Sequence, residues 1–204
     1  MRNNFSMPRR RLLASTLIML PELVLTRAFP ILAAGVPGEL EPTPSCGAAD
    51  ALTPAQTAGP FFKPRSPERK SLLEPGIQGS RIVLEGHVRT TKCQSIQGAL
   101  VDFWQADGSG VYDNAGYRLR GHQYSDASGR YRLETIVPGV YPGRTRHYHV
   151  RVQAPNRPVL TTQLYFPGEA ENQRDAIFNP KLVIDLRAST GAKSANFNFV
   201  LELG

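Results

Sequence analysis

Short runs of alternating apolar and polar residues, separated by turn residues, constrain the fold of this chain more than any other feature. Side chains two apart along a strand point to the same face of a sheet, so each run offers one apolar face. Before the third run, Gly129 can take the positive φ that closes a hairpin. Only residues 168–178 suggest a short helix. Strands in such a series predict an all-β fold, a single β-sandwich. The runs occupy residues 81–90, 99–105, 130–135, 147–153, 160–166 and 195–202.

Composition excludes several classes of protein. Hydrophobic residues make up 41% and charged residues 20% of the chain, a balance typical of globular proteins. No apolar run reaches the roughly 18 residues that span a bilayer. Two cysteines are too few for a thiolate zinc site. The formal net charge of +7 falls to +3 without residues 1–35, which hold five arginines and one glutamate, so we expect no nucleic-acid partner.

The first 35 residues predict an export segment. Arg9, Arg10 and Arg11 precede a mostly apolar run, the order found in secretory signals and, with paired arginines, in the twin-arginine type. We therefore expect a periplasmic or secreted protein with no stable membrane span after processing. Residues 36–58 predict an extended arm and residues 59–204 the sandwich domain.

Cys46 and Cys93 are the two cysteines of the chain. In an oxidising compartment an even count favours one disulfide between them, tying the arm to the turn before the second run. Two unrelated thiols are the alternative.

A metal site is suggested by His147 and His149. Two apart in an expected strand, they project both imidazoles to one face, where one ion could bind both. The alternative is a pair of solvated or hydrogen-bonded histidines. Tyr112 and Tyr141 lie in glycine-rich loops beside strand ends, where functional groups gather, and Arg144 lies three residues before His147. His87 and His122 lie outside this cluster, and we expect both to be structural or solvated.

The chain resembles the intradiol ring-cleavage dioxygenases, most closely the protocatechuate 3,4-dioxygenase type. The matching stretches follow one another in the same order as in the family and extend over residues 53–179. An exported subgroup is indicated by the export segment and the two cysteines, which depart from the cytosolic enzymes. The matching stretches are TPAQTAGPFF (53–62), GALVDFWQAD (98–107) with GVY (110–112), PGVYP (138–142), RTRHYH (144–149) and QLYF (163–166).

This resemblance implies a prealbumin-like sandwich with long active-site loops. It implies four ligands of a ferric ion, which are Tyr112, Tyr141, His147 and His149. It also implies that Arg144 lies beside the bound ring and that Gln163 orients the ligand His147, both acting in catalysis. Pro60 and Phe61 would lie near the substrate pocket. Arg146 matches no fixed role in the family.

The ligand set suits the expected chemistry, because anionic oxygen stabilises Fe³⁺, a hard cation, over Fe²⁺. The resemblance implies that a small aromatic diol and O₂ bind, and that the ring opens between its two hydroxylated carbons to give a muconate-type diacid. Self-association into a homo-oligomer is left open. Two alternatives remain, an exported iron- or catechol-binding sandwich without turnover, and a structural or carrier module without a metal.

Overall fold

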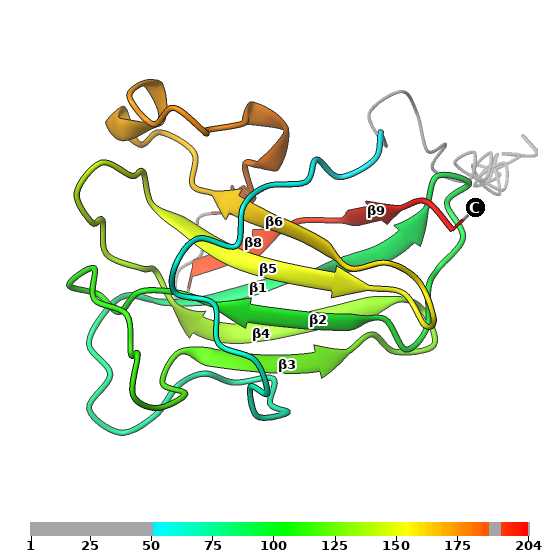
Figure 1. Cartoon of the computed structure of the whole chain (residues 1–204), viewed down its shortest axis with the longest axis horizontal. Coiled ribbons are helices and arrows are strands. Elements are labelled where there is room, and N and C mark those ends of the chain that lie inside the picture. The colour runs from blue at the N-terminus through cyan, green and yellow to red at the C-terminus, as the bar shows by residue number, and fades with distance from the viewer. Residues whose placement is uncertain (1–50, 188–192, 204) are drawn as a thin grey trace, which may run out of the picture. The chain divides into compact units, whose positions relative to one another are not determined.

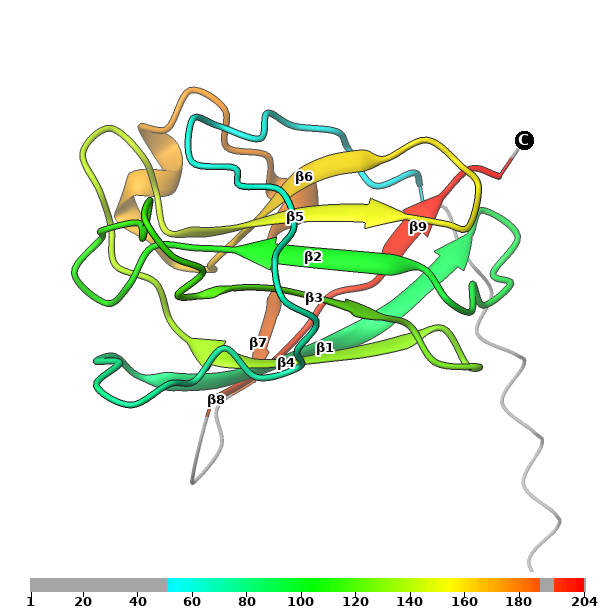
Figure 2. The same cartoon turned by 60° about the horizontal axis from the view of Figure 1, so that its bottom comes forward.

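The computed structural model describes residues 51–187 and 193–203, so the predictions for residues 1–50, the export segment and Cys46 among them, lie outside the described residues. Two sheets pack face to face, as Figures 1 and 2 show. This confirms the predicted β-sandwich. The first sheet holds β4 (Arg130–Ile136), β1 (Arg81–Thr90), β8 (Lys193–Asn196) and β7 (Asp185–Arg187) in that order, with β9 (Phe199–Leu201) also paired to β1. The second holds β3 (Arg120–Tyr124), β2 (Leu100–Trp104), β5 (His147–Gln153) and β6 (Leu160–Tyr165).

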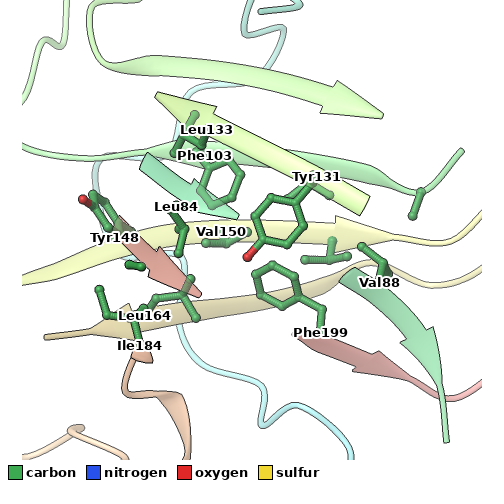
Figure 3. Packing of buried hydrophobic residues seen from close by; sticks show 14 of the residues in the cluster. Leu84, Val88, Phe103, Tyr131, Leu133, Tyr148, Val150, Leu164, Ile184 and Phe199 are labelled. Carbon is green, nitrogen blue, oxygen red and sulfur yellow. The ribbon is translucent and has the colours of Figure 1, made fainter. Parts of the chain in front are cut away.

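The core lies between the two sheets and is built from alternate residues of each strand. Phe103 of β2 and Val150 of β5 meet Tyr131 of β4 and Phe199 of β9 there, and all four are at most 2% exposed (Figure 3). The Tyr131 ring lies 5.8 Å from Phe103 and 5.4 Å from Phe199, measured between centroids. Burial of this apolar area is the main stabilising contribution, and it uses only the inward face of each sheet.

Two strands were not expected from the sequence, β3 and β7. β3 has the sequence RGHQY, which carries no aliphatic residue to mark an apolar face, yet it pairs antiparallel with all five residues of β2. β7 has only three residues, paired with β8. Neither strand alternates clearly enough to be predicted from periodicity.

The run expected as one strand at its carboxyl end is two strands, β8 and β9. Both pair parallel with β1 in the same register, but the ladder is interrupted at Phe197 and Asn198. There the side chain of Asn198 accepts a hydrogen bond from the backbone of His87, 2.9 Å, in place of a backbone partner. At Gly86 a Cβ atom would lie 1.8 Å from the Phe197 carbonyl oxygen, so only glycine allows this close approach.

The predicted helix at 168–178 is shorter than expected. Only η1 (Ala170–Gln173) is helical, as one 3₁₀ turn without buried residues. A second turn, η2 (Pro180–Leu182), follows, and the Asn179 side chain caps it by accepting from the Lys181 amide. These turns fit a connection that covers the end of the sandwich. No helix among the described residues has the length and apolar character needed to cross a membrane.

The described part of the expected arm, residues 51–58, is extended and bound to the sandwich. The Thr53 amide donates to the Val200 carbonyl at 3.0 Å, and the Gln56 amide donates to the Thr161 carbonyl at 2.8 Å. The segment thus links β9 of one sheet to β6 of the other. It is packed as part of the domain that was expected to start at residue 59.

Candidate active site

The two histidines of β5 lie on the face of their sheet that points away from the sandwich core. Tyr148, Val150 and Val152 of the same strand belong to the core, so the alternation places His147 and His149 on the opposite face. Both imidazoles are nevertheless buried, 3% and 1% exposed. Loops at one end of the sandwich cover them. In Figure 2 the connections from β2 to β3 and from β4 to β5, and the segment with η1, gather at that end.

Four aromatic side chains predicted as ligands meet at this covered face. The ring centroids of His147 and His149 lie 4.7 Å apart. Tyr141 lies 6.0 Å from His147, Tyr112 lies 6.1 Å from His149, and the two tyrosine rings are 6.0 Å apart. The four rings therefore form a closed circuit, in which each ring lies next to the following one and the last lies next to the first. The structure brings all four predicted ligands together, while their role in binding a metal stays a prediction.

The two tyrosines come from separate loops that are joined at their bases. The Gly139 amide donates to the Asp107 carbonyl at 2.7 Å, which ties the Tyr141 loop to the Tyr112 loop. Gly110 has a φ of +88°, and a Cβ there would lie 2.4 Å from the Val140 carbonyl oxygen. Glycine at this position is thus required both for the turn and for the approach of the loops.

Hydrogen bonding prepares His147 to act as a ligand. Its Nδ1 lies 2.6 Å from the Thr145 carbonyl oxygen, which can only accept, so the proton of the neutral ring belongs on Nδ1. Nε2 then carries a lone pair, and it lies 3.1 Å from Nε2 of His149. Among the described residues, Nδ1 of His149 is buried without a hydrogen-bond partner. Two imidazole edges facing one point fit a shared cation.

Burial keeps both histidines neutral. It lowers the pKa of His147 to about 4, against the opposing effect of the Thr145 carbonyl. Burial, the neighbouring His147 and the charge of Arg144 hold the pKa of His149 well below 6.5. Burial and the nearby Tyr141 also raise the pKa of the Tyr112 phenol, against the charge of Arg144. Without a cation the site thus holds two neutral imidazoles and a neutral Tyr112 phenol, and a bound cation would favour ionisation of that phenol.

Sequence reasoning missed two residues that fix His149. Trp104 stacks on it, with ring centroids 4.9 Å apart and an angle of 4° between the planes. The two residues are register partners on β2 and β5, a signal that becomes readable only once the pairing is known. Gly59, with φ of +65°, also lies close to this ring, and a Cβ there would lie 3.2 Å from Cε1 of His149.

Arg144 is held beside the four rings by Asp175, which sequence reasoning also missed. The Asp175 carboxylate accepts from Arg144 Nε and from the Thr145 amide, both at 2.9 Å, and from the Ile177 amide at 3.1 Å. Burial opposes the charge of the guanidinium, but Asp175 and the hydroxyl of Tyr141 raise the pKa of Arg144. A cation is therefore fixed next to the tyrosine.

Gln163 has a different contact from the one expected. Its Oε1 accepts from Arg144 Nη2 at 2.6 Å, and its Nε2 donates to the Thr57 carbonyl at 3.0 Å. The Nδ1 atom of His147 is already bound to Thr145, so Gln163 does not orient that histidine. The expectation was wrong because the ring of His147 finds its acceptor two residues away on its own chain segment. Gln163 positions the arginine instead.

Phe61 lies against the tyrosines as expected for a residue of the pocket. It stacks on Tyr112, with ring centroids 4.4 Å apart and 15° between the planes, and meets Tyr141 edge-on at 6.1 Å. Pro60 is exposed in the turn before it. A cavity of about 400 Å³ opens beside Tyr141 and Arg144, a size suited to a small aromatic ligand. Its lining residues are Val140, Tyr141, Pro142, Gly143, Arg144, Glu171, Arg174 and Asp175.

The remaining candidates lie outside the site. His122 bonds to the Ser66 carbonyl at 2.8 Å, and His87 is half-buried in β1 of the other sheet. Cys93 is disulfide-bonded, but Cys46 lies outside the described residues, so their pairing stays a prediction. In residues 51–187 and 193–203, no three His, Cys, Asp or Glu side chains could hold a metal ion.

Comparison with known proteins finds similarity to dioxygenases. A family model named Dioxygenase_C, described as Dioxygenase, matches residues 57–203. The hydroxyquinol 1,2-dioxygenase of Nocardioides simplex is 29% identical over 153 residues, 63% of this chain and 52% of its own. The protocatechuate 3,4-dioxygenase beta chain of Burkholderia cepacia is 33% identical over 120 residues, 49% of this chain and 50% of its own. The chain thus spans about half the length of these curated relatives.

A solved structure is more similar. The dioxygenase domain of a dioxygenase carbohydrate-binding protein fusion from the cellulolytic bacterium Streptomyces sp. SirexAA-E superposes with a TM-score of 0.74. It is 50% identical, and the match covers 76% of this chain and 100% of that domain. Together with the family model, which covers well over half of the residues, this shows that the chain belongs to the intradiol ring-cleavage dioxygenase family.

Proposed function

We propose that this protein is a ferric intradiol dioxygenase that opens the ring of a catechol-type diol with O₂ to give a muconate-type diacid. The observation that carries the proposal is the closed circuit of two phenols and two neutral imidazoles. Phenolate oxygen and imidazole nitrogen are donors that suit a hard trivalent iron. The matched relatives named as dioxygenases of hydroxyquinol and protocatechuate support a diol substrate.

The residues of the site have different roles in the proposed reaction. Tyr112, Tyr141, His147 and His149 would hold the iron, which when bound supplies the Lewis acidity that activates the diol. A tyrosine hydroxyl at the site can take or give the proton of a substrate hydroxyl, since a cation lowers the phenol pKa toward that of the diol. Burial of the four rings excludes bulk water from the reacting carbons.

Arg144 acts on the substrate ring. The guanidinium is fixed by Asp175 and Gln163, at 2.9 and 2.6 Å, so it needs no reorganisation when negative charge develops on the ring. Such preorganised cations stabilise a transition state more than mobile ones. Phe61 and the 400 Å³ cavity beside Tyr141 supply an apolar wall and room for the ring.

Iron loading with spectroscopy and oxygen uptake tests the proposal. Purified protein should bind one iron, absorb visible light by tyrosinate charge transfer, and consume O₂ with catechols. His149→Ala should lose iron and the visible band, whereas His87→Ala, which removes an imidazole from the other sheet, should keep both. A colourless iron-loaded protein would overturn the proposal. A coloured protein that binds catechols without consuming O₂ would be a binding protein instead.

We also propose that the protein acts outside the cytoplasm. The run Arg9–Arg11 before apolar residues supports this, as does the disulfide at Cys93, since disulfides persist in oxidising compartments. Cell fractionation should recover the protein from the periplasm or the medium, and recovery from the cytosol alone would refute export.

A further inference from the structure

Arg120 is a buried cation of the site that neither the resemblance nor the ligand circuit explains. It begins β3 and is 1% exposed. Its Nη1 donates to the Phe61 carbonyl at 2.6 Å, while Nε and Nη2 donate to the Asp113 carbonyl at 3.0 and 2.9 Å. Three nitrogens of the guanidinium therefore bind two backbone carbonyl oxygens, and no side chain accepts in this contact.

The two backbone oxygens belong to the segments that carry the facing rings of the pocket. Phe61 supplies one carbonyl itself, and Asp113 directly follows Tyr112. The rings of Phe61 and Tyr112 stack at 4.4 Å. One guanidinium thus joins two loops, more than 50 residues apart in sequence, at the place where their aromatic side chains meet.

Arginine suits this task better than lysine. The planar fork presents several donors in fixed directions, so it can satisfy two carbonyls at once, whereas an ammonium acts as a point charge. Among the described residues, no carboxylate forms an ion pair with Arg120 within 4.0 Å, and Asp113 is the strongest of the charges around it. A buried cation without a paired carboxylate is costly, which indicates that its hydrogen bonds have a specific use.

The strand that carries Arg120 is itself anchored. Arg69 donates to the Arg120 carbonyl from Nε at 2.9 Å and from Nη2 at 2.7 Å. On the other side Arg120 is the register partner of Trp104, the residue stacked on His149. The guanidinium therefore ties both loops to β3, which pairs with β2, the strand between it and the histidine-bearing β5.

We propose that Arg120 is a positioning residue, which clamps the backbones of Phe61 and Asp113 and so holds the Tyr112 ring in place for iron and the diol. The inference rests on the proposed function for what Tyr112 does. The clamp itself is a property of the chain without iron.

Arg120→Lys tests the clamp, because it keeps the charge and removes the fork. In the iron-free variant, amide hydrogen exchange at residues 59–63 and 112–116 should accelerate by about tenfold, the equivalent of losing one charged hydrogen bond. After iron loading, its tyrosinate band should shift or weaken and bound iron should fall. Phe61→Leu removes the stack and leaves the clamp, so it should change the band without accelerating exchange at 112–116.

Arg132→Lys is the control, since its guanidinium donates to the Glu134 carboxylate on β4 of the other sheet and touches neither Phe61 nor Asp113. It should leave both the amide exchange at 112–116 and the tyrosinate band unchanged. Unchanged exchange in folded Arg120→Lys would overturn the clamp. If that variant does not fold, exchange in the wild-type protein decides, and amides at 112–116 that exchange as fast as those of an unprotected loop overturn the clamp. A wild-type protein without a visible band would refute the proposed function, whereas the exchange comparison would still decide the clamp.

Discussion

Replacing Asp175 with asparagine tests how the structure holds Arg144. The carboxyl side chain is 2% exposed and the Arg144 side chain 16%, so this ion pair is shielded from solvent. The carboxylate accepts three hydrogen bonds, from Arg144 Nε and from the amides of Thr145 and Ile177. Asparagine has a single acceptor oxygen, so its amide group must face at least one of these donors.

The expected cost follows from these contacts. Asparagine can keep two of the three bonds by turning its oxygen toward Arg144 and Thr145, but the charge is lost. Breaking one partner of a buried ion pair costs about 3–5 kcal/mol, and the remaining exposure of Arg144 together with the bonds that survive reduces this to about 2–3 kcal/mol.

The stability difference should depend on pH in one direction. Burial acts to raise the pKa of Asp175, but the amides of Thr145 and Ile177 and the cation of Arg144 outweigh it, so the pKa lies below 3.8. A depressed folded-state pKa gives stability that is fully present above the unfolded value and lost as the pH falls through the folded one. The gap between wild type and variant should therefore be constant from about pH 6 to 8 and shrink below about pH 4.

Urea unfolding followed by circular dichroism measures this cost. A double-mutant cycle with Arg144→Ala should give a coupling energy of at least about 1 kcal/mol between the two residues. Asp185→Asn is the control, since the Asp185–Arg187 ion pair is 63% and 72% exposed and its loss should be close to zero. A loss below about 0.5 kcal/mol for Asp175→Asn, or additive effects with Arg144→Ala, would refute this account of the site.

Three further substitutions have defined outcomes. Gly59→Ala puts a Cβ at φ +65° and 3.2 Å from His149 Cε1, so iron content measured by metal analysis should fall while the fold persists; full occupancy would contradict this packing. Gly110→Ala forces the two tyrosine loops apart at the Val140 carbonyl, so it should cost more than about 1 kcal/mol in urea unfolding and weaken the visible band. Tyr131→Phe removes the 2.8 Å bond to the Phe197 carbonyl and should cost about 1 kcal/mol without changing the iron spectrum.

Most of the fold was predictable because five strands lie in short runs that are bounded by turn residues and are either alternating or, at 99–105, apolar on both faces apart from Asp102. The run at 81–90 is β1, and β2, β4, β5 and β6 begin and end within a residue or two of expectation. Tyr131 and Tyr148 of these strands pack in the core and donate their hydroxyls to backbone carbonyls. The shared face of His147 and His149 could be predicted for a similar reason, because residues two apart in a strand point to the same side, whereas the full set of four rings was implied by the resemblance to the family.

The supporting residues could not be predicted, because each depends on a pairing that periodicity does not reveal. Trp104 stacks on His149 because β2 pairs with β5 in this register. Asp175 forms its ion pair with Arg144 although the two are 31 positions apart in the sequence, with β5 and β6 between them. Arg120 lies on β3, which has no apolar face to mark it as a strand. Gln163 was expected to orient His147 for a similar reason: the actual acceptor is the backbone carbonyl of Thr145, a group that any residue type could supply.

The alternation of side chains between the two faces of β5 has a consequence for how mutations act on this protein. The even-numbered positions from Tyr148 to Val152 lie in the sandwich core, whereas the odd-numbered His147 and His149 lie on the opposite face, where the proposed function has them bind iron. Slipping this strand by one residue would exchange the two sets, burying imidazoles among aliphatic side chains and exposing the valines. Under the proposed function, a chain with β5 in the wrong register would bind no iron and show no tyrosinate band, and its exposed valines would make it less soluble. The visible band would therefore also report on correct folding.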